Sequence, residues 1–134
     1  MKADWDIAVN LNGKRIGIGV IIRDSKGLVI AALSRTVDTC PAPVIAESMG
    51  ALYASEFCCD LGVLDVILKG DSIQVVKAIN KMGDQCSRYG QVIVDVQMVL
   101  SSLRRWEVVH AKCEANFAAH GLTKIAAQEF TKKI

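Results

Sequence analysis

Residues 4–37 read DWDIAVNLNGKRIGIGVIIRDSKGLVIAALSRTV, and this stretch decides the fold class. Apolar and polar side chains alternate over residues 5–11, which predicts a strand with one apolar face. The Asn12-Gly13 pair is a strong hairpin signal, and a second alternating run follows over residues 16–22. The turn-forming segment DSKG then leads into a run of β-branched and small side chains over residues 28–37. Together these patterns predict a three-stranded antiparallel meander.

The spacing of the apolar residues changes after Pro41 and Pro43. Apolar residues recur every four positions from Ile45 to Leu61, which predicts a helix, and Gly62 stands where a helix-terminating glycine belongs. The remaining predicted elements, in chain order, are a strand over residues 63–68, a helix from Asp71 to Lys81, a helix over 92–103, a strand over 106–111 and a helix over 116–130. This order requires an α/β fold with a mixed five-stranded sheet that carries helices on its faces. The spacings leave room for a single domain spanning residues 1–134.

Composition excludes several classes of protein. Half of the residues are hydrophobic (51%) and 22% are charged, as in a folded globular domain rather than a disordered chain. A net charge of +2 and only 5% aromatic residues argue against a strongly basic nucleic-acid binder or a base-stacking platform, so any nucleic-acid contact must be local. No apolar run reaches the ~18 residues needed to span a membrane, and no secretion signal precedes the first strand. We therefore expect a soluble, intracellular protein, cytoplasmic or nuclear, that is neither secreted nor membrane-bound.

Two further sequence features exclude particular kinds of site. The five cysteines are odd in number and contain no CxxC spacing, so neither a disulfide framework nor a zinc site is indicated, and reduced, mostly buried thiols are expected. The glycine pair at Gly17 and Gly19 lies within a predicted strand that no helix follows, so it is not the phosphate loop of a nucleotide-binding fold.

Three carboxylates occupy positions from which they can converge. Asp6 lies within the first strand, Glu47 in the first turn of the helix after Pro43, and Asp71 at the end of the fourth strand. Each also has an ordinary interpretation: a solvent-facing strand residue, a favourable charge at a helix start, and a helix N-cap. Gathered at one side of the sheet, however, they would raise one another's pKa values unless a divalent cation compensated them. Oxygen ligands of this kind suit Mg²⁺ or Mn²⁺.

Four motifs, spread over nearly the whole chain, carry a resemblance to a known family. They are GIGVIIRDSKG at residues 17–27, AESMGAL at 46–52, GDSIQVV at 70–76 and EANFAAHGL at 114–122. With the order of predicted elements, which matches the ribonuclease H fold, they make the chain similar to the plant ribonuclease H-like domains. Such domains are found in retrotransposon-derived and related reverse-transcriptase-like proteins.

The resemblance implies a metal-dependent endonuclease that cuts the RNA strand of an RNA/DNA hybrid. Asp6, Glu47 and Asp71 match the first three metal-binding carboxylates of the family. A two-metal site of Mg²⁺ or Mn²⁺ ions about 4 Å apart would activate a water and stabilise the leaving 3′ oxygen. The expected products carry 5′-phosphate and 3′-hydroxyl ends, and the hybrid would be read through 2′-hydroxyls and backbone shape.

The chain also departs from the pattern of typical ribonucleases H. Where these place a fourth Asp, this sequence has His120, an expected metal ligand that would favour Mn²⁺ over Mg²⁺, the alternative being a surface or capping histidine. Ile7 replaces the glycine that usually follows the first Asp, and its branched side chain could restrict the approach of the substrate. His110 matches the loop histidine that assists proton transfer or product release, the alternative being an ordinary strand-end residue.

Two functions therefore remain open beside a metal-free structural role. One is an active hybrid nuclease, and the other is a catalytically impaired nucleic-acid-binding or protein-interaction domain that keeps the fold. Several basic residues are candidate phosphate contacts, or else scattered surface charge: Lys14, Arg15, Arg104, Arg105 and Lys112.

Overall fold

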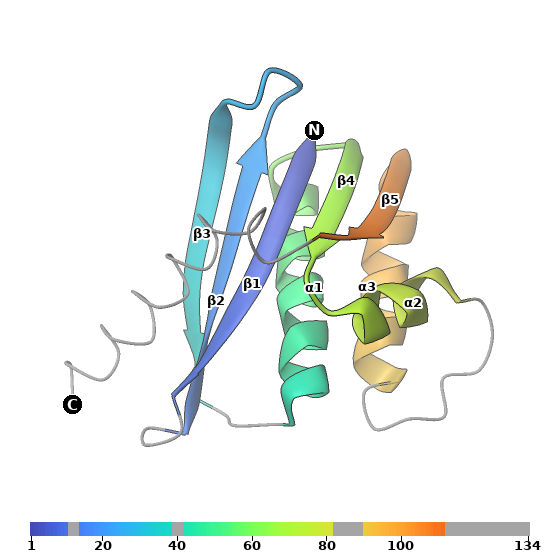
Figure 1. Ribbon diagram of the computed structural model, residues 1–134. Helices are drawn as coiled ribbons and strands as arrows, with labels where there is room; N and C mark the ends of the chain where they lie inside the picture. The colour runs from blue at the N-terminus through green and yellow to red at the C-terminus, as the bar shows by residue number, and fades with distance from the viewer. Residues whose placement is uncertain (11–13, 39–41, 82–89, 112–134) are drawn as a thin grey trace.

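The computed structural model describes residues 1–10, 14–38, 42–81 and 90–111 (Figure 1). Its elements, in chain order, are β1 (Lys2–Asn10), β2 (Arg15–Arg23), β3 (Val29–Val37), α1 (Pro43–Asp60), β4 (Asp65–Gly70), α2 (Ile73–Asn80), α3 (Gly90–Ser101) and β5 (Arg105–His110). This order agrees with the predicted one from the first strand to β5. The Asn-Gly hairpin turn and the helix predicted over residues 116–130 lie outside the described residues.

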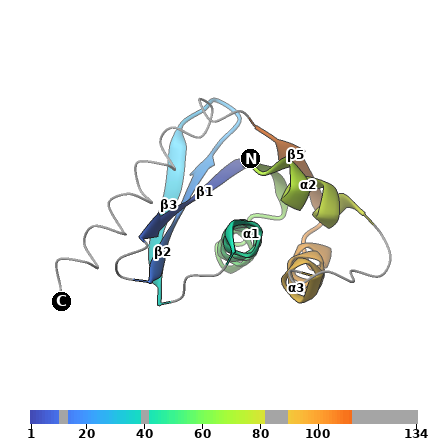
Figure 2. The same cartoon turned by 60° about the horizontal axis from the view of Figure 1, so that its bottom comes forward.

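The five strands form one mixed sheet in the order β3-β2-β1-β4-β5. β1 pairs antiparallel with β2, and β2 with β3, whereas β4 runs parallel to both β1 and β5. The predicted meander and mixed sheet are therefore confirmed. Helices α1 and α3 lie side by side against one face of this sheet (Figures 1 and 2).

Local hydrogen bonds explain where several elements begin and end. The Asp24 carboxylate accepts from the backbone N–H groups of Lys26 and Leu28, and Gly27 takes a positive φ of 84°, which closes the turn between β2 and β3. At the end of α1, Gly62 adopts φ 73°, and the N–H of Val63 donates to the carbonyl of Cys58. Because this helix ending uses the backbone of Val63, β4 starts two residues later than predicted, at Asp65.

Two sequence interpretations concerning the acidic residues are wrong. Pro43 is already inside α1, as its fixed φ allows at a helix start, and the first turn of the helix contains no acidic residue. Glu47 therefore belongs to the second turn and does not act on the helix terminus. Asp71 is not an N-cap either: Ser72 caps α2, accepting from the N–H of Val75 at 3.4 Å. The carboxylate of Asp71 is thus available for another role.

The hydrophobic core lies between the sheet and the helices. Trp5 and Leu68 contribute from the strands, and Ile93 and Leu100 contribute from α3. Of the two described cysteines, Cys58 is buried and Cys59 exposed, and both are free thiols, so the expectation of burial holds for one of them. None of the described helices is both long and apolar enough to cross a membrane.

Candidate metal centre

The site forms where two parallel strands separate. β1 and β4 are paired only from Lys2 with Ile67 to Asp4 with Lys69, and beyond this point the strands diverge (Figure 1). Asp6 lies two positions after Asp4, and Asp71 two positions after Lys69, so the two carboxylates occupy equivalent positions beyond the last pair. Ligands in α/β sheets commonly bind at such an opening, next to the carboxyl ends of strands.

The third carboxylate comes from α1. Glu47, in the second turn of that helix, is partly buried, and one ligand atom from each of Asp6, Glu47 and Asp71 lies within 4.8 Å of the others. Asp6 is 3% exposed, which rules out the interpretation as a solvent-facing strand residue. The structure therefore brings together the three acids that the sequence singled out, one from the middle of β1, one from just after β4 and one from α1.

The electrostatics of the cluster favour a bound cation. Burial, together with the neighbouring Asp71 and Asp6 carboxylates, raises the pKa of Glu47 to about 8, although the nearby Trp5 opposes this shift. Within the described part of the chain, the buried Oε2 of Glu47 has no hydrogen-bond partner. A divalent cation would both pair this oxygen and offset the repulsion, and an all-oxygen donor set fits Mg²⁺ or Mn²⁺.

The backbone next to Asp6 orients its side chain. The N–H of Ile7 donates to Asp6 Oδ1 at 2.8 Å, which fixes one carboxylate oxygen. The side chain of Ile7 packs on the core toward Gly50 of α1, on the face of β1 opposite to Asp6. Ile7 therefore points to the other face of β1 from Asp6, and its effect on the approach of a substrate stays a prediction.

His110 is the last residue of β5 and is exposed. Its Nε2 lies 3.1 Å from the backbone carbonyl oxygen of Asp71, and the next residue, Ala111, donates its N–H to the carbonyl of Gly70 at 2.8 Å. The end of β5 is thereby attached to the segment that carries Asp71. His120, the expected fourth ligand, lies outside the described residues.

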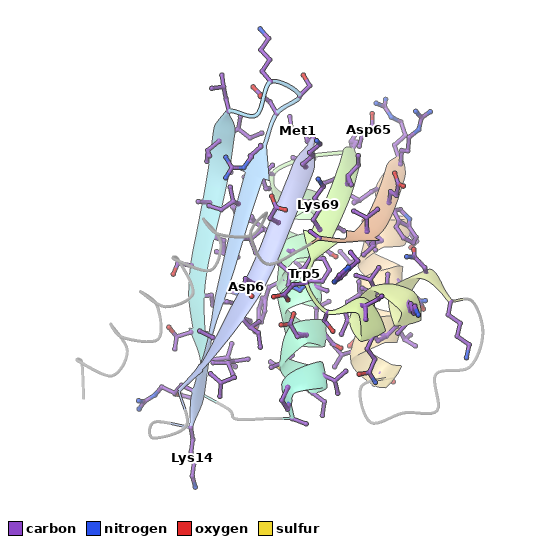
Figure 3. The ribbon with its side chains drawn as sticks, viewed as in Figure 1. Met1, Trp5, Asp6, Lys14, Asp65 and Lys69 are labelled. Atoms are coloured by element: carbon purple, nitrogen blue, oxygen red, sulfur yellow. The ribbon has the colours of Figure 1, made fainter. Side chains whose placement is uncertain are left out.

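The candidate phosphate-binding residues do not gather in one place. Arg15 is paired with Asp38 at 3.0 Å, and Arg104 with Asp65, whose position is at the opposite end of the molecule from Lys14 (Figure 3). Lys112 lies outside the described residues. For the described members of the set, the interpretation as scattered surface charge fits better than a single basic patch.

Sequence reasoning gave no special role to two residues of β1 that precede Asp6. Trp5, assigned only to the apolar face of β1, is the neighbour that opposes the raised pKa of Glu47. Asp4 shares the face of Asp6, and its burial raises its pKa although Lys69 opposes the shift. The glycine directly before Asp71 and the glycine one turn after Glu47 were signals that a large side chain fills the space beside the acids.

The fold and the acidic cluster together define a protein of the ribonuclease H fold with a candidate centre for divalent cations. A family model described as "Reverse transcriptase-like" matches residues 5–126, and the chain belongs to this family. Among curated proteins, none matches the sequence at a significant level.

Solved structures support the same fold. The chain superimposes on ribonuclease H1 from the archaeon Halobacterium salinarum with a TM-score of 0.86 and 23% identity, covering 96% of this chain and 97% of that one. For LC11-RNase H1, isolated from compost and solved with an RNA/DNA hybrid, the TM-score is 0.84 at 19% identity, covering 97% and 98%. The N-terminal RNase H domain of Rv2228c from Mycobacterium tuberculosis gives 0.83 at 19%, covering 98% and 97%.

Proposed function

We propose that the protein is a metal-dependent endonuclease that hydrolyses the RNA strand of RNA/DNA hybrids. The observation that carries the proposal is the convergence of Asp6, Glu47 and Asp71 within 4.8 Å at the opening between β1 and β4. The fold adds support, because the similar LC11-RNase H1 was solved in complex with such a hybrid.

The residues of the site have separate roles in this reaction. Asp6, Glu47 and Asp71 hold the divalent cations, with one oxygen of Asp6 oriented by the N–H of Ile7. Bound Mg²⁺ or Mn²⁺ supplies the charge that activates a water and stabilises the leaving 3′ oxygen. His110, fixed beside Asp71, offers its second ring nitrogen for proton transfer or product release.

The proposal extends to the substrate and to the choice of metal. The small net charge and the dispersed cations favour recognition of 2′-hydroxyls and backbone shape over strong electrostatic binding, so hybrid affinity should be modest and sensitive to salt. A histidine at position 120 as fourth ligand would remove one negative charge and make Mn²⁺ more effective than Mg²⁺. The plant, retrotransposon-derived branch of the family, which the motifs resemble, is the proposed origin.

The test is cleavage of an end-labelled RNA/DNA hybrid with Mn²⁺ or Mg²⁺. The wild-type protein should produce 5′-phosphate and 3′-hydroxyl ends and act only on the RNA strand. Asp71→Asn should abolish cutting, whereas Asp60→Asn, which changes an exposed carboxylate at the end of α1, should retain it. Mg²⁺ clearly outperforming Mn²⁺ would contradict His120 as a ligand.

The same assay distinguishes the second function left open by the sequence. A protein that binds the hybrid and Mn²⁺ but does not cut would be a binding module that keeps the fold. A protein that binds neither would leave the acidic cluster without a role and would overturn the proposal.

A further inference from the structure

The indole of Trp5 is enclosed between two glycines. Trp5 is fully buried, and a Cβ atom added at Gly50 would lie 2.7 Å from its Cδ1. A Cβ added at Gly70 would come still closer to the other end of the ring system, 2.5 Å from Cε2 and 2.6 Å from Cη2. Carbon atoms do not approach within 3.0 Å without displacement, so the indole occupies the space that side chains at both positions would need.

Backbone conformation does not explain the glycine at position 50. Gly50 lies in the middle of α1, where a glycine costs roughly 0.5–1 kcal/mol relative to alanine. In the described part of the chain, positive φ angles among glycines occur at Gly27 and Gly62, and not at Gly50. Room for the Trp5 ring is therefore the physical reason for this glycine.

Each of the three segments that pack at the indole also carries one of the acids. Trp5 directly precedes Asp6, and Gly70 directly precedes Asp71. Gly50 follows Glu47 by three positions and so lies on the same side of α1. One rigid side chain thus touches every segment whose position sets the distances between the carboxylates.

We propose that Trp5 is a positioning residue of the metal centre, and that Gly50 and Gly70 are its fitted partners. By filling the gap between β1, α1 and β4, the indole fixes the separation of Asp6, Glu47 and Asp71. This inference rests on the metal site of the proposed function and adds the group that determines its affinity.

The test compares the two tryptophans of the chain. Trp5→Phe removes the indole N–H and part of the filling, and loss of such supporting contacts typically weakens metal binding about 10–100-fold. Trp106→Phe is the matched control, because Trp106 is a partly buried residue of β5 at the edge of the core. Mn²⁺ dissociation constants, measured from the electron paramagnetic resonance of free Mn²⁺, should rise at least about tenfold for Trp5→Phe and stay within about twofold for Trp106→Phe.

Thermal unfolding separates positioning from simple stability. If Trp5 were only a core residue, Trp5→Phe would unfold at a lower temperature but bind Mn²⁺ like the wild type while folded, and the inference would be wrong. If the wild type itself binds no Mn²⁺, the proposed function fails instead.

A second variant covers the case in which Trp5→Phe does not fold. Gly50→Ala keeps the tryptophan but displaces the ring, and it too should weaken Mn²⁺ binding.

In the folded Trp106→Phe protein, Trp5 is the remaining tryptophan, so its emission should change on Mn²⁺ addition and should not change when Asp71→Asn is also present. An unchanged emission together with tight Mn²⁺ binding would contradict the contact between the indole and the site.

Discussion

The Nε2 of His110 and the backbone carbonyl oxygen of Asp71 are 3.1 Å apart, which joins the last residue of β5 to the acid at the end of β4. A carbonyl oxygen can only accept a hydrogen bond, so Nε2 is the donor in this contact. This arrangement gives the exposed histidine a defined orientation beside the proposed catalytic centre.

Replacing His110 by alanine should therefore separate catalysis from stability. An exposed hydrogen bond of this kind contributes only about 1 kcal/mol or less to folding, whereas loss of a proton-transfer group typically costs about 100-fold or more in rate. We expect His110→Ala to unfold at nearly the wild-type urea concentration and to lose most hybrid cleavage. A variant that cuts at the wild-type rate would remove His110 from the mechanism.

The stability of the metal-free protein should fall as the pH rises. The pKa of Glu47 is raised from 4.5 in the unfolded chain to about 8 in the folded one, so between these values the folded state holds a proton that the unfolded state has lost. Glu47 therefore contributes stability that is complete below pH 4.5 and is lost as the pH passes 8. Urea unfolding in EDTA should show a decline on the order of 2–4 kcal/mol from pH 5 to pH 8.

Glu47→Gln serves as the control for this pH dependence. It removes the titrating group, so the remaining dependence should be much shallower and the variant should exceed the wild type in stability at pH 8. A wild-type protein that becomes more stable over this range would contradict the raised pKa.

Divalent cations should stabilise the folded protein, because they offset the repulsion among the three clustered carboxylates. A ligand at 100 times its dissociation constant stabilises a folded protein by about 2.7 kcal/mol, so saturating Mn²⁺ should raise the unfolding temperature by several degrees. Asp71→Asn should lose this response. Without metal, the same variant should be slightly more stable than the wild type, because one repulsive charge is gone. Equal Mn²⁺ responses in the two proteins would exclude Asp71 as a ligand.

Replacing Ser72 should lower the stability of the metal-free protein, whereas replacing Asp71 should raise it slightly. Because its hydroxyl caps α2, Ser72→Ala should cost about 1 kcal/mol in urea unfolding. Ser102→Ala, which removes an exposed hydroxyl just after α3, should cost much less. If Ser72→Ala were neutral while metal-free Asp71→Ala was destabilised by about 1 kcal/mol, Asp71 would be the true cap.

The predictable part of the fold is encoded locally. The alternation in β1 and β2 and the DSKG turn specify the meander from neighbouring residues, and the four-residue spacing of α1 with Gly62 at its end specifies that helix. The prediction of the helix N-cap was wrong where two adjacent residues can both serve as a cap. In the Asp71-Ser72 pair either side chain can cap a helix, and tertiary contacts decide which one does, because the Asp71 carboxylate is among the other acids.

The sequence allows the three acids of the candidate site to be predicted, but not the packing that holds them in place. The order of elements indicates that Asp6, Glu47 and Asp71 can converge at one side of the sheet, and the family resemblance implies a metal-binding role for all three. The burial of Asp6 and the contact of Trp5 with two distant glycines depend on packing between segments far apart in the chain, which no local pattern contains. Such contacts become visible only once the strands and helices are placed together.

The enclosure of Trp5 also constrains how this sequence can change over time. A mutation of Gly50 or Gly70 to any larger residue meets the indole, and a smaller residue at position 5 leaves a void that larger residues at those positions can fill. The three positions should therefore vary as a linked set among homologues: lineages with tryptophan at position 5 should keep both glycines, and lineages that lost the tryptophan should be free to replace them.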